Sequence, residues 1–437
     1  MRVVDWRDRG FTAAYKKLIH RFDADAGGVA MAVRKIIADV RRRGDAAVLH
    51  YTEQFDRLRL RPNEMRVGTD EVARAYDTAD PAVVASLRYA AARIHAFHER
   101  QKKKGWSIKK GGVYLAQRIH PIDRVGLYVP GGTAAYPSSV LMNAIPARVA
   151  GVPQVVICSP APNGAINPHL LVAADIAGVS EIYRIGGVQA VAAMAYGTET
   201  VPAVDKIVGP GNAYVAEAKR QVFGRVGIDM IAGPSELLLI ADEAANPVYV
   251  ACDLLSQAEH DTGAVVVFLT TSRKLVVEVK KEMKAQLTGL PRKSIASAAL
   301  KRHGITFVVP SIEKAIEMAN SIAPEHLSIF VADPFACLDR ICHAGSVFLG
   351  EMTPQALGDY VAGPNHVLPT GGTARFSSPL SVDDFVKKGS VICYSKAALQ
   401  AAGPHLIHLA EAEGLSAHAN MIRVRFPQRF RNHALSS

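Results

Sequence analysis

The chain has 437 residues and a formal net charge of +11, with 49% apolar and 21% charged residues. A chain of this length holds about two to four domains, and its apolar content excludes an intrinsically disordered protein. No apolar run approaches the roughly 18 residues of a membrane-spanning helix, so we expect no membrane partner. The N-terminal residues lack the apolar core of a signal peptide, and the five cysteines have no framework spacing, so we expect a cytoplasmic protein.

The segment 102–110 is strongly basic and carries one aromatic residue, Trp106. Such a run can bind nucleic acid, but no nucleic-acid-binding motif accompanies it here. We therefore expect a solvated loop and no nucleic-acid partner.

Apolar residues at helical spacing, with charges on the opposite face, predict a largely helical N-terminal part. These helices are expected at residues 29–43, 71–78 and 81–101. Beyond Arg124, short β-rich runs alternate with helical patterns. Strands are expected at 124–129, 153–158, 181–185 and 206–208, and helices at 138–149, 169–177, 189–196 and 214–223. Glycine-rich turns at 130–132, 186–187 and 209–212 lead from strand to helix, which is typical of βαβ units on a parallel sheet.

A second alternating series begins at Leu237. Strands are expected at 237–240, 264–269, 305–309 and 327–331, and helices at 248–259, 274–286 and 312–321. The last part differs, with helices expected at 397–403 and 404–413 and a strand at 421–426. The pattern predicts an α/β fold with two Rossmann-like parallel-sheet domains and small segments appended at both ends.

The domain boundaries are expected as follows. An N-terminal helical segment covers 1–23, and a discontinuous Rossmann-like domain covers 24–127 and 237–379. The second Rossmann-like domain covers 128–236, and a small C-terminal domain covers 380–437.

The dipeptide Glu325-His326 is the most informative local feature. Pro324 before it disfavours helical geometry at Ala323 and indicates that a helix ends there. A carboxylate beside an imidazole can divide proton transfers if both point into a cleft. The alternative is a solvated loop, and the dipeptide alone does not decide between the two.

Gln257 and His260 stand at positions i and i+3 near the end of an expected helix, so they share one face. An amide oxygen and an imidazole suit zinc or a similar ion, although the pair is not a complete metal motif. Other candidate ligands are Asp359, His366 and His418.

The glycine-rich turns are candidates for phosphate binding, because a strand, a glycine turn and a helix start present free N–H groups. The segment 209–211 supplies only two glycines of the dinucleotide fingerprint, so ordinary turns remain an alternative. Ser235 lacks the surroundings of a nucleophilic serine, and we expect it to contact a substrate or to cap a helix.

Together and in this order, these segments closely resemble the histidinol dehydrogenase family, from about residue 25 to about residue 427. The resemblance rests on 124–133 (RVGLYVPGGT), 184–190 (RIGGVQA), 209–213 (GPGNA), 228–236 (IDMIAGPSE), 256–260 (SQAEH), 323–327 (APEHL), 358–360 (GDY) and 365–370 (NHVLPT), with Glu413 and His418.

The resemblance implies oxidation of L-histidinol to L-histidine through bound L-histidinaldehyde, with NAD and a zinc ion (Zn2+) as cofactors. It implies that Glu325 and His326 form the proton-transfer pair. The implied zinc ligands are Gln257, His260, Asp359 and His418. The implied substrate contacts are Ser235, His366 and Glu413, together with the zinc ligands and His326. The implied NAD contacts, within the domain 128–236, are Tyr128, Gln189 and Asn212.

The family's members are intertwined homodimers, which implies that Glu413 and His418 complete the site of the partner subunit. One alternative is a dehydrogenase of the same fold and metal that acts on another small polar alcohol or diol. A carboxylate at Glu413 favours an amino alcohol over an anionic one. A nucleic-acid-binding or scaffolding protein would use the +11 charge instead. An inactive regulatory member should lack a zinc ligand, and the sequence retains all of them.

Overall fold

The computed structural model describes residues 1–21, 27–131 and 136–428. The expected boundary between 23 and 24, and Gly132 and Thr133 of the first glycine-rich turn, lie outside these residues. Residue contacts divide the chain into two compact units. One comprises Met1–Lys102 and Ile122–Phe385, and the other Lys103–Pro121 and Val386–Ser437.

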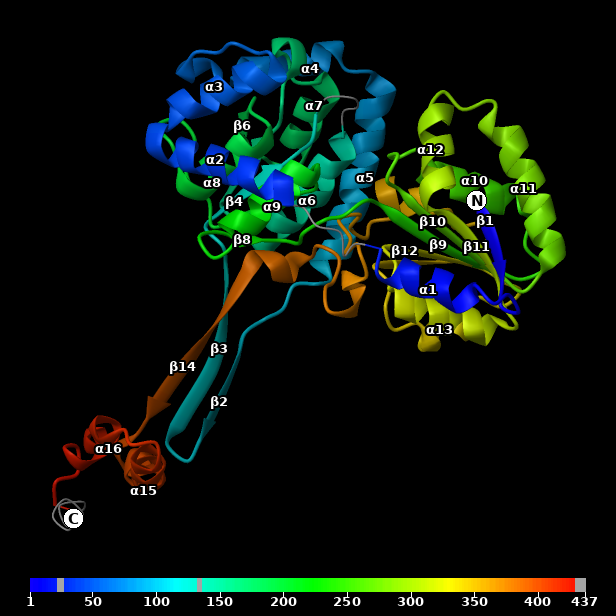
Figure 1. Cartoon of the computed structure of the whole chain (residues 1–437). Helices are drawn as coiled ribbons and strands as arrows, with labels where there is room; N and C mark the ends of the chain where they lie inside the picture. The colour runs from blue at the N-terminus through cyan, green and yellow to red at the C-terminus, as the bar shows by residue number, and fades with distance from the viewer. Residues whose placement is uncertain (22–26, 132–135, 429–437) are drawn as a thin grey trace. The chain divides into compact units, whose positions relative to one another are not determined.

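A six-stranded, entirely parallel sheet forms one half of the first unit. Its strands in spatial order are β1 (Arg2–Asp5), β11 (Gly304–Val308), β10 (Val265–Thr270), β9 (Glu236–Ala241), β12 (His326–Phe330) and β13 (Ser346–Leu349). Helices lie on both faces of this sheet (Figure 1): α10 (Pro247–Ala258), α11 (Arg273–Leu287) and α12 (Lys293–His303) on one, α1 (Phe11–Ile19) and α13 (Ile312–Ile322) on the other. Every residue of β9, β10 and β12 is buried, because a parallel sheet covered on both faces needs apolar side chains on both.

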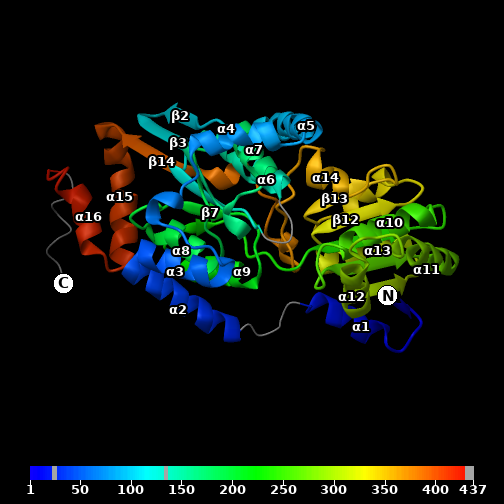
Figure 2. The same cartoon turned by 90° about the horizontal axis from the view of Figure 1, so that it is seen from above.

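A five-stranded parallel sheet forms the other half. Its order is β6 (Glu181–Tyr183), β5 (Gln154–Cys158), β4 (Arg124–Tyr128), β7 (Lys206–Val208) and β8 (Gly227–Ile228). One face carries α4 (Thr69–Thr78), α5 (Pro81–Glu99), α6 (Pro137–Ala150) and α7 (Pro168–Ile176). The other carries α2 (Gly27–Arg43), α3 (Asp45–Asp56), α8 (Gly187–Tyr196) and α9 (Ala213–Val222), as Figure 2 shows.

In the five-stranded sheet the chain starts at the central strand β4, adds β5 and β6 on one side, and then adds β7 and β8 on the other. The winding therefore reverses between β4 and β7, which is where sheets of this kind bind nucleotides beyond their carboxyl ends. Tyr128 ends β4, and the turn 209–212 follows β7 at that edge.

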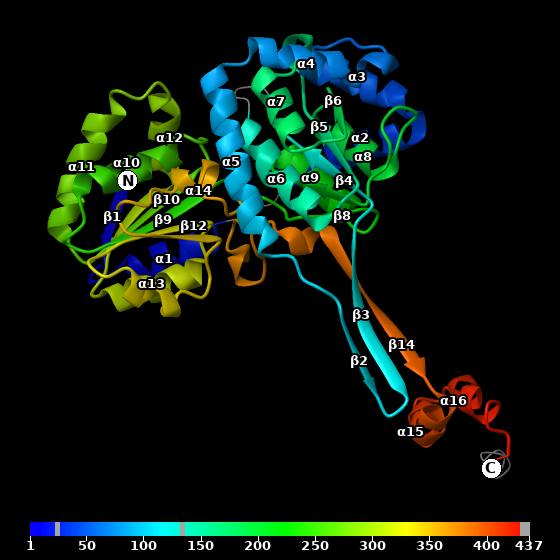
Figure 3. The same cartoon turned by 180° about the vertical axis from the view of Figure 1, so that it is seen from behind.

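The second unit contains an antiparallel three-stranded sheet in the order β14 (Val386–Tyr394), β3 (Val113–Pro121) and β2 (Trp106–Lys110). Two helices, α15 (Lys396–Ala412) and α16 (Ser416–Arg423), follow β14 (Figure 3). Among the described residues, no helix is long and apolar enough to cross a membrane.

The predicted α/β fold with two parallel sheets is confirmed, and the elements expected between 124 and 331 match the observed ones closely. The expected division of the chain is wrong at three points. Residues 2–5 pair with β11, so they belong to the six-stranded sheet rather than to a separate helical segment. The helices of 27–99 and strand β4 belong to the five-stranded sheet, because their apolar faces pack on α6–α9. The C-terminal unit also includes 103–121, which pairs with β14.

Three local expectations are also wrong. Residues 421–426 are not a strand, because helix α16 continues to Arg423, and Ala419, Ile422 and Phe426 pack into one apolar cluster with Ile407 and Ala410 of α15. The helices expected at 397–403 and 404–413 are a single helix, since Gly403 has no Cβ to clash with the ring of Pro404. The basic segment is not a loop throughout, because Trp106–Lys110 form the exposed edge strand β2.

Candidate active site

Glu325 and His326 lie at the amino-terminal end of β12. Helix α13 ends at Ile322, and Ala323 takes a left-handed backbone conformation (φ 50°) that turns the chain into the strand. Both residues are buried: 6% of the surface of Glu325 and 5% of the surface of His326 is exposed to solvent. The alternative of a solvated loop is therefore wrong for this dipeptide.

The backbone of Glu236, at the start of the neighbouring strand β9, contacts both residues. Its N–H donates a hydrogen bond of 2.7 Å to Oε2 of Glu325. Its carbonyl oxygen lies 2.9 Å from Nδ1 of His326. Because a carbonyl oxygen only accepts, Nδ1 carries a proton and Nε2 of a neutral ring keeps its lone pair.

Nε2 of His326 is buried and has no hydrogen-bond partner within the described part of the chain. Its nearest charged neighbour is Asp359, whose Oδ1 lies 3.6 Å away. The other ring nitrogen lies 3.6 Å from Oε2 of Glu325. An imidazole held by one nitrogen, with the other free and two carboxylates close by, is arranged for proton transfer.

The electrostatics of this pair follow from burial and proximity. Burial raises the pKa of the Glu325 carboxyl to about 7, against the lowering effect of the His326 charge. Burial alone would lower the pKa of His326, but the charge of Glu325 and the contact with Asp359 raise it to about 9. Near neutral pH these shifts favour a protonated His326 beside Glu325, and the ring becomes a base as the pH rises toward 9.

The candidate metal ligands Gln257, His260 and Asp359 come from two elements beside this pair. Gln257 is fully buried near the end of α10, and His260 follows that helix. Asp359 lies on the short helix α14 (Ala356–Tyr360). Burial would raise the pKa of Asp359, but the contact with His326 and the charges of His326, His366 and His260 hold it below its ordinary value. Asp359 is thus an ionised carboxylate among imidazoles.

The donors of this group suit a zinc ion. Amide oxygen, imidazole nitrogen and carboxylate are all ligands that zinc accepts. Burial lowers the pKa of His260, which keeps its imidazole neutral as a metal ligand must be. Within the described residues no group of three or more His, Cys, Asp or Glu is arranged to hold a metal ion, and the glutamine amide of Gln257 is not of those types.

His366 is held by neighbouring groups of the same unit. Its Nδ1 lies 2.9 Å from the carbonyl oxygen of Asp359 and therefore donates to it. Its Nε2 lies 3.2 Å from Oγ of Ser139, at the start of α6. With both nitrogens occupied, His366 connects the chain around Asp359 to α6.

The sequence did not single out several residues that the site depends on. Arg21 forms a buried, bidentate ion pair with Glu236: its Nε donates to Oε1 at 2.6 Å and its Nη2 donates to Oε2 at 2.7 Å. Gln355 donates a hydrogen bond of 3.0 Å to Oε1 of Gln257. No sequence spacing points to these contacts, because they join positions that are 215 and 98 residues apart.

The candidate NAD contacts lie at the carboxyl edge of the five-stranded sheet. The hydroxyl of Tyr128 accepts a hydrogen bond of 3.2 Å from the N–H of Gly187, which opens α8. Gln189 in the same helix is fully buried, and neither atom of its amide has a partner among the residues described. Asn212 caps α9 through its side-chain oxygen, which accepts from Tyr214 and Val215. An unpaired buried amide beside a glycine turn fits a dinucleotide that supplies the missing hydrogen bonds.

A buried ion pair holds the turn before Asn212. Lys219 and Asp229 pair with 3% and 1% of their side chains exposed. Lys219 also donates to the carbonyl of Gly209 at 2.9 Å, and Asp229 accepts from the N–H of Gly209 at 2.8 Å. The turn is therefore fixed at both backbone groups of Gly209.

The remaining candidates are placed as follows. Ser235 directly precedes strand β9, so the helix-cap alternative is wrong, and the substrate contact stays a prediction. Glu413 caps the end of α15, and His418 lies in the first turn of α16. Both are exposed on the second unit.

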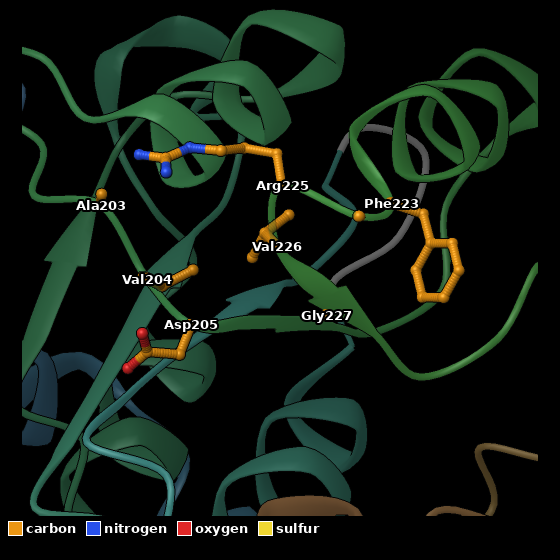
Figure 4. Close-up of a pocket in the computed structure, with 8 residues that line it drawn as sticks. Ala203, Val204, Asp205, Phe223, Arg225, Val226 and Gly227 are labelled. Carbon is orange, nitrogen blue, oxygen red and sulfur yellow. The ribbon is translucent and has the colours of Figure 1, made fainter. Parts of the chain in front are cut away.

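The pockets on the described part of the first unit include the following two. One is lined by residues from α5, α6 and α14, together with Glu259, His260 and Arg292. It therefore gives access to a candidate metal ligand. The other lies at the amino-terminal ends of β7 and β8, where Asp205 and Arg225 stand on one side and Phe223 on the other (Figure 4). Its lining residues differ from all the candidates named above.

A glycine turn at the reversal point of one parallel sheet and a buried Glu-His pair at the amino-terminal end of an inner strand of another are typical of an α/β enzyme. The histidinol dehydrogenase family model matches residues 19–426. Histidinol dehydrogenase from Geobacter sulfurreducens is 52% identical over 427 residues, covering 97% of this chain and 100% of that protein. The Bacillus cereus enzyme is 52% identical over 401 residues, covering 92% and 93%.

A crystal structure of histidinol dehydrogenase from Elizabethkingia anophelis superposes with a TM-score of 0.92 at 40% identity, covering 98% of both chains. The chain belongs to the histidinol dehydrogenase family and is an oxidoreductase.

Proposed function

We propose that the protein oxidises L-histidinol to L-histidine through bound L-histidinaldehyde, with NAD as oxidant and Zn2+ at Gln257, His260, Asp359 and His418. The observation that carries this proposal is the buried Glu325-His326 pair. The backbone N–H and carbonyl of Glu236 hold the two side chains, and Nε2 of His326 has no hydrogen-bond partner in the described chain. Family membership supports the substrate, and the amide and imidazole donors beside the pair support the metal. Sparse cysteines support a cytoplasmic enzyme.

His326 is proposed as the base of both oxidations. In the first, Nε2 of the neutral ring takes the hydroxyl proton while the carbinol carbon loses a hydride, which leaves the aldehyde, and His326 then releases this proton to solvent. Glu325 then takes a proton from the water that adds to the aldehyde carbon. In the second oxidation, His326 takes a hydroxyl proton of the hydrated aldehyde as the second hydride leaves, which produces the acid.

Gln257, His260, Asp359 and His418 would hold zinc, which would supply a Lewis acid that orients the substrate, and two NAD molecules would each accept one hydride. Tyr128, Gln189 and Asn212 are proposed to hold NAD, and Gln189 has the buried, unpaired amide that such a role requires. Ser235, which precedes β9 beside Glu236, is proposed to contact the substrate. His366 is proposed to contribute to substrate binding next to Asp359, whose backbone carbonyl accepts a hydrogen bond from its Nδ1.

The protein is proposed to act as a homodimer in which Glu413 and His418 complete the partner's site. The second unit has a small described core, Ile407, Ala410, Ala419, Ile422 and Phe426. Large apolar side chains remain exposed on it, among them Ile392 at 70%, Leu409 at 67% and Val424 at 61%. Surface of this kind favours packing against a second copy, which brings the exposed Glu413 carboxylate to the substrate's ammonium group.

The test is His326→Asn in the zinc-loaded protein. Asparagine keeps a donor for the carbonyl of Glu236 but has no nitrogen that accepts a proton. We expect zinc content and NAD binding to match the wild type while NADH production from histidinol falls by a factor of about 10² or more. Turnover close to the wild-type rate would overturn the proposed role of His326.

A second candidate function is a dehydrogenase of the same fold that acts on another small polar alcohol or diol. Glu413 decides between them, because a carboxylate attracts an ammonium group and repels an anion. Rates of NADH production from histidinol, from a neutral diol and from a sulfonated diol compare the two directly. A higher kcat/KM for either diol would favour the second candidate.

A further inference from the structure

Gln355 connects two of the candidate metal ligands. It is 1% exposed and precedes α14 as its N-terminal cap. Its carbonyl oxygen accepts hydrogen bonds from the N–H groups of Gly358 and Asp359, at 2.8 and 3.3 Å. Its side-chain Nε2 lies 3.0 Å from Oε1 of Gln257. One residue thus holds Asp359 through its backbone and Gln257 through its side chain.

Gln355 is also tied to α10 one helical turn before Gln257. Burial raises the pKa of the Asp253 carboxyl, and the neighbouring backbone N–H of Gln355 lowers it. Asp253 and Gln257 stand at i and i+4, so they lie on the same face of α10. The two attachments fix the start of α14 against the end of α10.

The two amides have a second way to pair. Nε2 of Gln257 and Oε1 of Gln355 are both buried and lack a hydrogen-bond partner in the described chain. Turning both amides by half a turn about their last side-chain bond exchanges oxygen and nitrogen at the contact. Nε2 of Gln257 then donates to Oε1 of Gln355, and Oε1 of Gln257 becomes free. This second arrangement leaves both lone pairs of the amide oxygen available to a cation and turns the amide N–H, which cannot bind a metal, toward Gln355.

We propose that Gln355 is a positioning residue for the metal site, which accepts a hydrogen bond from the Gln257 amide so that its oxygen faces the cation. This inference rests on the proposed function, since it assumes that Gln257 and Asp359 bind the metal. Residues that orient a ligand in this way typically change metal affinity about 10- to 100-fold when they are replaced.

The test compares substitutions of Gln355 that keep or remove the acceptor. Gln355→Glu keeps an oxygen that accepts but cannot donate when ionised, and Gln355→Met keeps the length without either function. Gln221→Met is the matched control, because it deletes a half-buried amide with hydrogen bonds to Ala30 and Glu217 far from these ligands in the sequence. Zinc affinity is measured in the full-length protein by competition with a chromophoric chelator, independently of activity.

We expect Gln355→Met to weaken zinc binding about 10- to 100-fold, while Gln355→Glu and Gln221→Met stay within about threefold of the wild type. Wild-type affinity in Gln355→Met would overturn the proposal. So would a loss in Gln355→Glu as large as that in Gln355→Met, because it would show that Gln355 acts as a donor. If Gln355→Met does not fold, Gln355→Asn replaces it, since the shorter amide cannot reach Gln257.

Two further variants distinguish failure of this inference from failure of the proposed function. Asp359→Ala and Gln257→Ala remove proposed ligands directly. If both lose zinc while Gln355→Met does not, only the positioning role is wrong. If both bind zinc as tightly as the wild type, the proposed metal site is wrong and the inference is overturned with it.

Discussion

The carbonyl oxygen of Glu236 accepts a hydrogen bond of 2.9 Å from Nδ1 of His326, so the backbone of β9 selects which nitrogen of this imidazole stays free. The N–H of the same residue holds Oε2 of Glu325 at 2.7 Å. The side chain of Glu236 forms a buried ion pair with Arg21, and its negative charge adds to burial in raising the pKa of Glu325. One residue with no proposed chemical role therefore orients both members of the proposed proton-transfer pair.

Glu325→Gln is expected to separate the two oxidations. The glutamine oxygen still accepts from the N–H of Glu236, so the fold and the position of His326 are retained. The amide cannot take a proton from water, so oxidation of the aldehyde should fall by a factor of about 10² to 10⁴ while oxidation of the alcohol changes much less. Stopped-flow NADH formation, started from histidinol and from histidinaldehyde, measures each step. Equal losses in both would show that Glu325 is not specific to the water step.

Two inactive variants are expected to restore activity when their subunits are mixed. In a heterodimer of His326→Asn and His418→Ala, one site combines His326 with an intact His418 from the partner. The other site carries both substitutions. Random exchange makes half of the dimers mixed, so about a quarter of the wild-type activity should return. No recovery after verified subunit exchange would indicate that His418 serves its own subunit.

Gly209→Ala is expected to be strongly destabilising. Gly209 has φ +108°, and a Cβ there would overlap the carbonyl oxygen of Tyr128. Backbone strain and overpacking together should lower the free energy of unfolding by about 2–6 kcal/mol, and the shift at Tyr128 should weaken NAD binding.

Gly224→Ala is the matched control for this substitution. It has a similar φ of +96°, but no atom lies within 4 Å of the added Cβ. We expect only the strain cost of about 1–3 kcal/mol and unchanged NAD affinity. Chemical denaturation and NAD fluorescence titration measure both variants. Equal effects of the two substitutions would rule out the close approach to Tyr128 as the cause.

Asp253→Asn is expected to stabilise the protein at neutral pH but not in acid. Burial raises the pKa of the Asp253 carboxyl to about 6 in the folded state, above its ordinary value of 3.8. The folded state therefore binds this proton more tightly than the unfolded state, so the carboxyl lowers stability as pH rises from about 4 to 6. Asparagine removes this loss and still offers an oxygen to the N–H of Gln355.

The measurement is the difference in unfolding free energy between Asp253→Asn and the wild type across this range. The difference should grow between about pH 4 and 6 and then stay constant. A difference that does not change with pH would show that the carboxyl titrates normally in the folded state.

Much of the parallel fold could be predicted from the sequence. Strands β4 to β7 and their helices were predicted because apolar periodicity and glycine turns are local properties of the chain. Strands β1, β13 and β14 were missed, since they gain stability by pairing with distant strands. The apolar residues Met421, Ile422, Val424 and Phe426 fit both the two-residue period of a strand and the 3.6-residue period of a helix. The strand prediction is wrong because Ile422 and Phe426 pack against α15 instead.

The sequence by itself determined the family, the residue types of the candidate site and the presence of two parallel sheets. Only the tertiary structure decided how these residues are held, because the contacts that orient them use groups that sequence patterns do not distinguish. Every residue has the same backbone carbonyl, yet that of Glu236 defines the free nitrogen of His326. Likewise Gln355 reaches Gln257 only because α14 begins beside the end of α10 in the folded chain. Chemical identity is a property of the sequence, whereas direction, burial and charge pairing arise from packing between distant segments.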